Sequence, residues 1–211
     1  VQADDLRKAL EVGSTRKQTV SAVRGEIVDR NGVPLVSNKQ GYDVIIDKVF
    51  FPRAEQNDII LKLVDFFEER NTPWIDYLSM ITKEQPFAFL SGYDSEIATL
   101  KKKMDVQPYA TVENTMDQVV EKYKLEDYSA ADARKIASVR YGMDLREFQI
   151  EIPYTFATDI DISLVLELKE RSYMLPGVEI QEKPLRSYDL GAIAPHLIGQ
   201  IGVIFEEQWK N

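Results

Sequence analysis

The sequence predicts an α+β fold in which both ends of the chain form one sheet and the middle forms an inserted block of helices. Apolar residues near both ends alternate with polar ones, which is the period of strands, whereas in the middle they recur every three or four residues, which is the period of helices. Insertions succeed where chain ends lie close together. We therefore expect a discontinuous mixed-sheet base, residues 1–51 and 147–211, carrying an inserted helix-rich head lobe, residues 52–146.

The N-terminal part of the chain is expected to contain a short amphipathic segment followed by strands. Residues 4–12 carry leucine and alanine at helical spacing. Apolar pairs flank Asn31-Gly32, which tolerate the positive φ angles of a tight turn, so a β-hairpin is expected there. A loop at residues 37–41 should lead to a third strand at residues 42–47.

Helices dominate the predicted head lobe. They are expected over residues 56–70, 95–104, 113–123 and 129–141, each with apolar residues on one face. A further helix is expected to begin at Thr72-Pro73, because threonine caps helices and proline suits the first helical position. This helix would carry Trp74, Tyr77, Leu78 and Ile81.

Strands are expected to return in the C-terminal part. Residues 147–152 alternate apolar and polar side chains, and Pro153 should end that strand. A helix capped by Asp159 or Asp161 should follow, because aspartate is a preferred N-cap. A turn containing glycine then leads to a strand at residues 178–182.

Composition excludes several classes of function. The chain has 211 residues, a formal net charge of −9 and no cysteine. The acidic balance argues against nucleic-acid binding, which usually needs a basic face, and the lack of cysteine excludes disulfides and thiolate metal sites. No apolar run approaches the roughly 18 residues of a membrane span.

Motifs with catalytic meaning are sparse. Ser14-x-x-Lys17 has the spacing used by penicillin-recognising enzymes, but neither Ser-x-Asn nor Lys-Thr-Gly follows it. His196 is the sole histidine, which leaves little for a triad or a histidine metal site and favours a structural role. We expect no catalytic, metal-binding or cofactor-binding residue in this chain.

Three charges in and beside the hairpin call for partners. Arg24, Asp29 and Arg30 are five and six positions apart, and strand side chains alternate between faces. At least one of them should therefore face a packed surface, where an unpaired charge is costly.

Three separated motifs resemble one protein family. Residues 24–32, Arg-Gly-Glu-Ile-Val-Asp-Arg-Asn-Gly, closely resemble the signature that opens the pedestal, or dimerisation, domain of class B penicillin-binding proteins. Leu-Pro-Gly-Val at residues 175–178 with Pro-Leu-Arg-Ser-Tyr at residues 184–188, and Ala-Pro-His-Leu-Ile-Gly-Gln-Ile-Gly at residues 194–202, resemble two later motifs of that family.

The resemblance implies a non-catalytic pedestal that lifts and positions a D,D-transpeptidase domain for peptidoglycan cross-linking. It implies an N-terminal membrane anchor before this chain, a serine transpeptidase domain after it, and a location on the extracytoplasmic face of the bacterial cytoplasmic membrane. The implied partners are that transpeptidase domain, a membrane-embedded glycan polymerase, scaffold proteins of elongation or division, and a second copy of the chain; nucleic acid is not expected.

The resemblance also implies a structural junction where the three motifs converge. Charged and polar side chains there would be paired around close-packed glycines and would hold the pedestal against the catalytic domain. The predicted junction residues are Arg24, Gly25, Asp29, Arg30, Gly32, Arg186, Tyr188, His196, Gly199 and Gly202.

Two other classes of function remain open from the residues alone. An acidic-site hydrolase would need a deep pocket with convergent carboxylates of perturbed pKa. A stand-alone extracytoplasmic glycan- or peptide-binding module would need an exposed aromatic platform, for which Trp74, Tyr77, Phe87 and Phe89 are the candidates.

Overall fold

The computed structural model describes residues 22–188, and these divide into two compact units. One unit contains the described parts of Val1–Lys39 and Pro184–Asn211, and the other is Gln40–Lys183. The predicted segment at residues 4–12, Ser14, His196, Gly199 and Gly202 lie outside the described residues.

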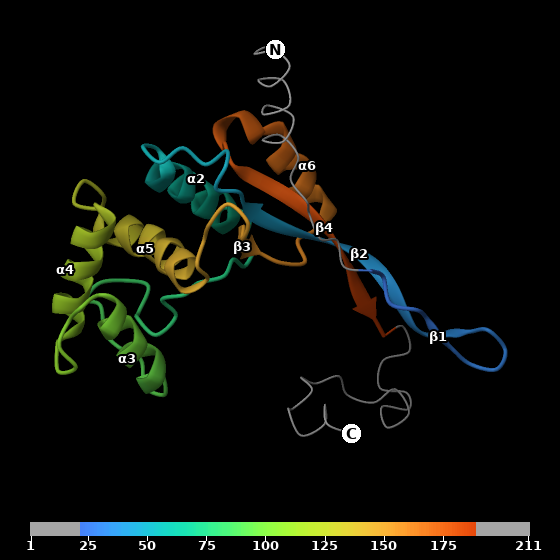
Figure 1. Cartoon of the computed structure of the whole chain (residues 1–211), viewed down its shortest axis with the longest axis horizontal. Coiled ribbons are helices and arrows are strands. Elements are labelled where there is room, and N and C mark those ends of the chain that lie inside the picture. Colours follow the sequence, from blue (N-terminus) through green and yellow to red (C-terminus); the bar gives the residue numbers. More distant parts are fainter. Residues whose placement is uncertain (1–21, 189–211) are drawn as a thin grey trace, which may run out of the picture. The chain divides into compact units, whose positions relative to one another are not determined.

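Two strands precede a run of four helices, and strands return after it, which confirms the α+β class (Figure 1). In chain order they are β1 (Ile27–Val28), β2 (Pro34–Ile46), α2 (Gln56–Glu68), α3 (Asp94–Lys103), α4 (Val112–Tyr123), α5 (Ala130–Leu145), β3 (Tyr154–Ala157), α6 (Ile162–Glu170), the short 3-10 helix η1 (Ser172–Met174) and β4 (Val178–Ser187).

Strand β2 organises the sheet. It pairs antiparallel with β1, where Ile27 lies opposite Val36, and antiparallel with β3, where Val44 lies opposite Ala157; β4 also pairs with β2. The predicted loop at residues 37–41 is wrong, because β2 runs through it without a break. The stretch lies between the part of β2 that pairs with β1, up to Val36, and the part that pairs with β3, from Val44, so it stays extended although its composition favours a turn.

Helices of Gln40–Lys183 bury their apolar faces in a common core. Helices α2 and α5 pack together, and α5 also packs against α4 (Figure 1). Local caps begin three helices as expected from residue type: Thr111, Ser129 and Asp161 each accept a hydrogen bond from a backbone N–H of the first turn. The most deeply buried large side chains are Tyr141, Tyr154, Phe67, Phe156, Ile46, Ile59, Ile60, Leu63, Leu78, Ile81, Leu100 and Leu125.

The predicted helix beginning at Thr72-Pro73 is wrong. The segment is irregular, and groups distant in sequence bind its backbone: the Ile75 N–H, for example, donates to the Phe156 oxygen of β3 at 3.0 Å. Arg134 of α5, only 2% exposed, donates hydrogen bonds of 2.8 to 3.0 Å to three of its carbonyl oxygens. The acceptors are Leu78, Ile81 and Thr82.

Other contacts complete this arrangement. Ser138 of α5 accepts a hydrogen bond from the Tyr77 N–H at 2.8 Å and donates one to Asp76 Oδ1 at 2.7 Å. The same carboxylate pairs with Arg134 at 3.0 Å. A Cβ on Gly142 would lie 2.3 Å from the Tyr77 ring, so only glycine lets the loop approach α5 this closely.

The predicted strand at residues 147–152 is also wrong. Only an isolated bridge joins Gln149 to Ile152, and Ile150 is 56% exposed, so the alternating pattern faces no partner sheet. The strand starts after Pro153 instead of ending there, because Tyr154 and Phe156 are the side chains that reach the core.

The unit boundaries differ from the predicted base and lobe. Residues 40–51 and 147–183 were assigned to the base by sequence, but they belong to the same compact unit as the helices. Val44, Phe51 and Leu164, for example, share one apolar cluster with α2 and α5. The division of this chain into a base, residues 1–51 and 147–211, and an inserted lobe, residues 52–146, stays a prediction.

Candidate functional site

The turn of the β1–β2 hairpin is closed by Asp29. Its Oδ1 accepts hydrogen bonds from the backbone N–H groups of Asn31 at 2.7 Å and Val33 at 2.9 Å. The backbone adds a bond from the Asp29 N–H to the Val33 oxygen at 2.9 Å. Bonds from Val33, Asn31 and Gly32 favour the ionised form and hold the pKa of the Asp29 carboxyl below its ordinary value.

The two glycines of the hairpin motif differ in what their backbone positions require. Gly32 has φ +82°, in the left-handed region that side chains with a Cβ rarely adopt, and it donates to the Asp29 oxygen at 3.0 Å. Gly25 has no described atom within 4 Å of where a Cβ would stand. Among the described residues, no atom lies within 4 Å of a Cβ position on either glycine, so the close packing implied by the resemblance stays a prediction.

Arg186 of β4 ties together segments that are far apart in sequence. Its Nη1 donates to the carbonyl oxygen of Gly25 at 2.6 Å and to Asn38 Oδ1 at 3.3 Å. Asn38 of β2 in turn donates from Nδ2 to the Arg24 oxygen at 2.7 Å. We call Arg186, Asn38 and the Arg24-Gly25 carbonyl groups the arginine brace; all four residues lie in the same compact unit.

The structure brings together some of the predicted junction residues. Arg186 meets the backbone of Arg24 and Gly25, while the Arg24 and Arg30 side chains are exposed and Tyr188 is 49% exposed. Asp29 finds its partners in its own turn rather than on a packed surface. The predicted participation of His196, Gly199 and Gly202 falls on residues outside the described part.

Asn38 is the member of the brace that sequence reasoning missed. It lies in a polar stretch that composition assigned to a loop, and its bond to Arg24 spans fourteen positions. A prediction that the strand continues through residues 37–41 would have identified Asn38, because it places Asn38 in the same strand as the core residue Val36 and two positions after it.

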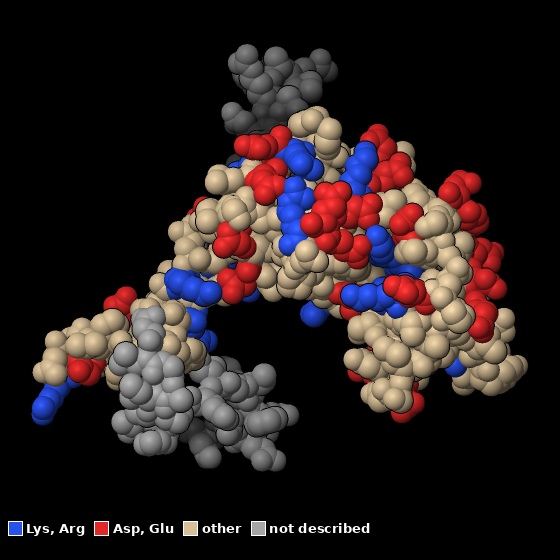
Figure 2. Space-filling model, turned by 180° about the vertical axis from the view of Figure 1, so that it is seen from behind, with Lys and Arg blue, Asp and Glu red and all other residues tan. Residues whose placement is uncertain are grey.

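The described residues give no support to the acidic-site hydrolase. Within residues 22–188 there is no group of three metal-ligating side chains. The carboxyls there with a shifted pKa, Asp29 and Asp161, are both lowered by hydrogen bonds to their own turn or helix cap. On the face drawn in Figure 2, basic and acidic side chains are interspersed, without an extended basic surface for nucleic acid.

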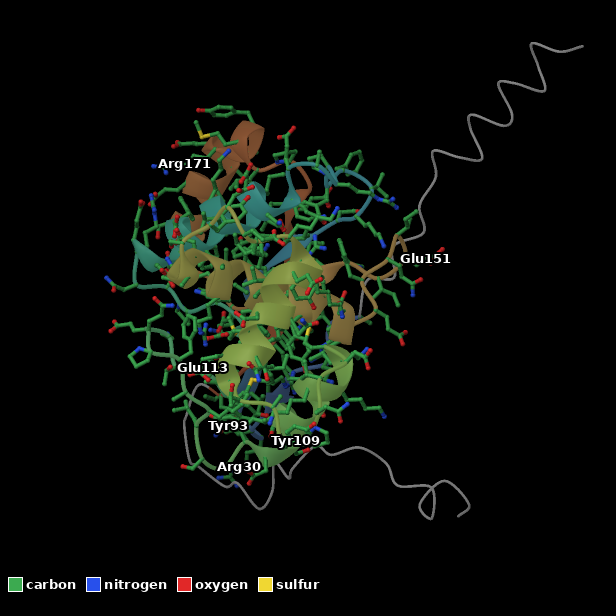
Figure 3. The ribbon with its side chains drawn as sticks, turned by 90° about the vertical axis from the view of Figure 1, so that its left-hand side faces the viewer. Arg30, Tyr93, Tyr109, Glu113, Glu151 and Arg171 are labelled. Atoms are coloured by element: carbon green, nitrogen blue, oxygen red, sulfur yellow. The ribbon has the colours of Figure 1, made fainter. Side chains whose placement is uncertain are left out.

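The aromatic platform is not formed by the residues proposed for it. Trp74 stacks on buried Phe156 with ring centroids 5.7 Å apart, and Tyr77 packs against Tyr154 at 6.1 Å. Phe87 and Phe89 also pack against the core, half-buried. A different aromatic side chain is at the surface: Tyr109, between α3 and α4, is 85% exposed and is labelled in Figure 3.

No helix within residues 22–188 has the length and apolar character needed to cross a bilayer.

The described residues form an α+β module with an apolar core, in which the arginine brace joins segments distant in sequence; they show no assembled catalytic group. Residues 19–211 match the family model described as penicillin-binding protein dimerisation domain. The chain therefore belongs to the penicillin-binding protein dimerisation domain family, in agreement with the resemblance of its three motifs.

Comparison with solved structures gives weaker likenesses. Penicillin-binding protein 2B of Streptococcus pneumoniae strain 5204 and of strain R6 each align with 20% sequence identity and a TM-score of 0.37. Each alignment covers 81% of this chain and 26% of the other, so the chain spans about a quarter of those proteins. A comparison with curated protein sequences found no match.

Proposed function

We propose that this chain is the pedestal of a peptidoglycan D,D-transpeptidase and that the arginine brace sets the orientation of that pedestal relative to a catalytic domain that follows it. The observation that carries the proposal is the convergence of two family motifs on one set of hydrogen bonds. Arg186, from the second motif, donates to the backbone of Gly25, from the first. Membership in the dimerisation-domain family supplies the class of protein in which such a module would serve.

The brace suits an orienting role because of what it bonds. A guanidinium that binds carbonyl oxygens fixes main-chain geometry, whereas side-chain pairs leave the backbone freer. The strand that carries Arg186 ends one residue later, at Ser187, so the brace restrains the path by which the chain leaves β4.

The orienting role is tested in the longer protein that contains both domains. Spin labels placed on β2 and on the transpeptidase domain report the distribution of distances between them; the present chain has no native cysteine to interfere. We expect Arg186→Ala to broaden this distribution while the fluorescent penicillin adduct still forms. Lys62→Ala, an exposed change on α2, is the matched control.

An unchanged distance distribution in both Arg186→Ala and Asn38→Ala would contradict the orienting role. A loss of penicillin labelling in Arg186→Ala would show damage to the catalytic domain and would also count against it. The present chain alone should form no penicillin adduct, so a covalent adduct on Ser14 would overturn the non-catalytic assignment.

The proposed partners extend beyond the transpeptidase domain. The family's description as a dimerisation domain supports association with protein partners, and we infer as candidates a second copy, a membrane-embedded glycan polymerase and scaffold proteins of elongation or division. Sedimentation of the chain over a range of concentrations tests the homodimer. Pull-down with the polymerase and the scaffolds tests the others, and a lack of contact by both the chain and the longer protein would reject them.

The proposed location is the extracytoplasmic face of the bacterial cytoplasmic membrane, with an anchor preceding this chain. The support is the chemistry of the proposed reaction, since peptidoglycan is cross-linked outside that membrane. Protease added to intact protoplasts should digest this region of the longer protein. Protection of the region until the protoplasts are lysed would contradict the location.

A further inference from the structure

A cleft within Gln40–Lys183 differs in charge from the rest of this acidic chain. It has a volume of about 670 Å³ and lies where the N-terminal turn of α2 meets α4 and α5. Its lining holds more cations than carboxylates, although the whole chain carries a net charge of −9. The cations are Arg53, Lys122, Lys124 and Arg140, and the carboxylates are Asp58 and Asp127.

Arg140 is the central cation of the cleft. The α5 helix carries it, and its guanidinium carbon lies 5.4 Å from the centroid of the Tyr123 ring. The side chain is half-buried, and burial lowers its pKa while the nearby Asp144 opposes that effect. Such a guanidinium has five N–H donors to satisfy.

The carboxylates that could neutralise Arg140 have other partners. Asp144 accepts a hydrogen bond from the Tyr123 hydroxyl at 2.8 Å and pairs with Lys122 at 3.4 Å. Asp58 accepts from the Tyr128 hydroxyl. Within residues 22–188 no carboxylate lies within 4.0 Å of the Arg140 nitrogens, so Arg140 lines the cleft without an ion pair there.

Asn57 holds another part of the lining in place. Its Nδ2 donates to the carbonyl oxygens of Tyr123 at 3.0 Å and Lys124 at 3.4 Å, which joins the first turn of α2 to the end of α4. Arg53 precedes that turn, and Glu55, the N-cap residue, makes no side-chain cap bond. The positive end of the α2 dipole adds to the arginines, and Asp58 in the first turn offsets part of it.

An adjoining cleft indicates which kind of chemical group could extend from an anion bound at Arg140. It has a volume of about 630 Å³ and shares Arg53 and Arg140 with the first. Its lining is partly apolar and also includes Lys48 and the carboxylates Asp144 and Glu147. Phe51 and Phe148 meet edge to face there with centroids 6.3 Å apart, and Met143 lies beside them. A group with an anionic end at Arg140 and an apolar or neutral extension fits both clefts.

We propose that this double cleft binds a phosphate group, with Arg53 and Arg140 as its principal donors. Guanidinium groups match phosphate oxygens in geometry. A phosphate monoester as a dianion gains about twice the attraction of a monocarboxylate from the same cations, whereas a phosphodiester headgroup carries one charge and relies on the geometric match. The inference is independent of the pedestal role. The phosphate could belong to a soluble phosphate ester or to a lipid headgroup, and the experiment separates these sources.

Binding is tested by nuclear magnetic resonance titration of the chain with glycerol phosphate at low ionic strength. We expect saturable shifts of amides around the α2 N-terminus and α5, and at least about tenfold weaker affinity in Arg140→Gln. Because Arg140 is half-buried, Arg53→Ala, an exposed change, serves as the second variant and should also weaken binding.

Lys102→Ala is the matched control. It lies in another cleft, of about 600 Å³, where Lys101 and Lys102 are balanced by Asp94 and Asp105. Unsaturable shifts, or equal weakening by Arg53→Ala and Lys102→Ala, would overturn the proposal.

A second binding experiment, with lipid vesicles, identifies the source of the phosphate. Flotation with phosphatidylglycerol vesicles that is lost in Arg53→Ala, and is absent with phosphatidylcholine, would support a lipid headgroup. Binding of glycerol phosphate without flotation would support a soluble ester. Absence of both would reject the phosphate site.

Discussion

Two arginines, one in each compact unit, show how differently the same side chain can organise backbone. Arg134 and Arg186 each donate to main-chain carbonyl oxygens more than fifty positions away. Arg134 is 2% exposed and pairs with Asp76, whereas Arg186 is half-buried beside the hairpin. Water can replace the partners of Arg186 but not those of Arg134, so burial rather than the number of bonds should decide what each contributes to stability.

The largest effect is expected from Arg134→Met. Loss of the guanidinium leaves Asp76 without its cationic partner and removes the donor from three carbonyl groups, which should lower the free energy of unfolding by about 3–5 kcal/mol. Urea denaturation of the chain followed by circular dichroism measures this change. Arg171→Met, an exposed arginine over the Phe66 ring, is the control and should cost less than about 1 kcal/mol. Equal losses of stability in Arg134→Met and Arg171→Met would contradict the role of burial in this comparison.

A pair of glycines extends the comparison to backbone packing. Gly177 has φ +81°, and a Cβ there would lie 2.8 Å from the Phe51 backbone, so Gly177→Ala should cost about 2 kcal/mol or more. Gly25→Ala places its methyl group where no described atom lies within 4 Å and should change stability by less than about 0.5 kcal/mol. Thermal unfolding of both variants measures the difference, and a costly Gly25→Ala would reveal packing against residues outside the described part.

A smaller effect is expected from Arg186→Ala. Its hydrogen bonds are partly open to water, so the loss should be about 1 kcal/mol. A double-mutant cycle with Asn38→Ala should show coupling, because both side chains belong to the same brace. Hydrogen exchange of the hairpin amides measures the loss of stability in the hairpin itself. Additive losses would mean that the two residues act separately.

The smallest effect is expected from protonation of Asp29. Its pKa is lower in the folded hairpin than its ordinary value of 3.8, so the carboxylate contributes stability above that value. That contribution should be lost as pH falls through the lower folded pKa. A carboxyl titration by nuclear magnetic resonance should give a midpoint below 3.8, and Asp29→Asn should remove the acid-dependent loosening of the Asn31 amide. A midpoint at or above 3.8 would contradict the turn geometry.

Local rules were sufficient where the deciding contacts lie within a few residues. The hairpin at Asn31-Gly32, the caps at Ser129 and Asp161, and the turn before β4 could all be predicted, because a positive φ or a cap bond depends on near neighbours in the chain. The motifs likewise indicated the family that the match over residues 19–211 shows.

Local rules failed where the backbone forms hydrogen bonds with groups that are distant in sequence. A helix was expected after Thr72, but Arg134 and Ser138 bind that segment and Phe156 accepts the Ile75 N–H at 3.0 Å. A strand was expected before Pro153, but the side chains that fill the core come after it.

The candidate site divides in the same way. Sequence by itself determined the fold class, most of the helices, the hairpin with its Asp29 turn, and the choice of Arg186 as a candidate junction residue. Only the tertiary structure decided that Arg186 meets the Gly25 carbonyl through a brace that includes Asn38, and that Arg140 faces a cleft without a carboxylate partner among the described residues. The physical reason is that turns and caps depend on bonds a few residues long, whereas these contacts join groups that only folding brings together.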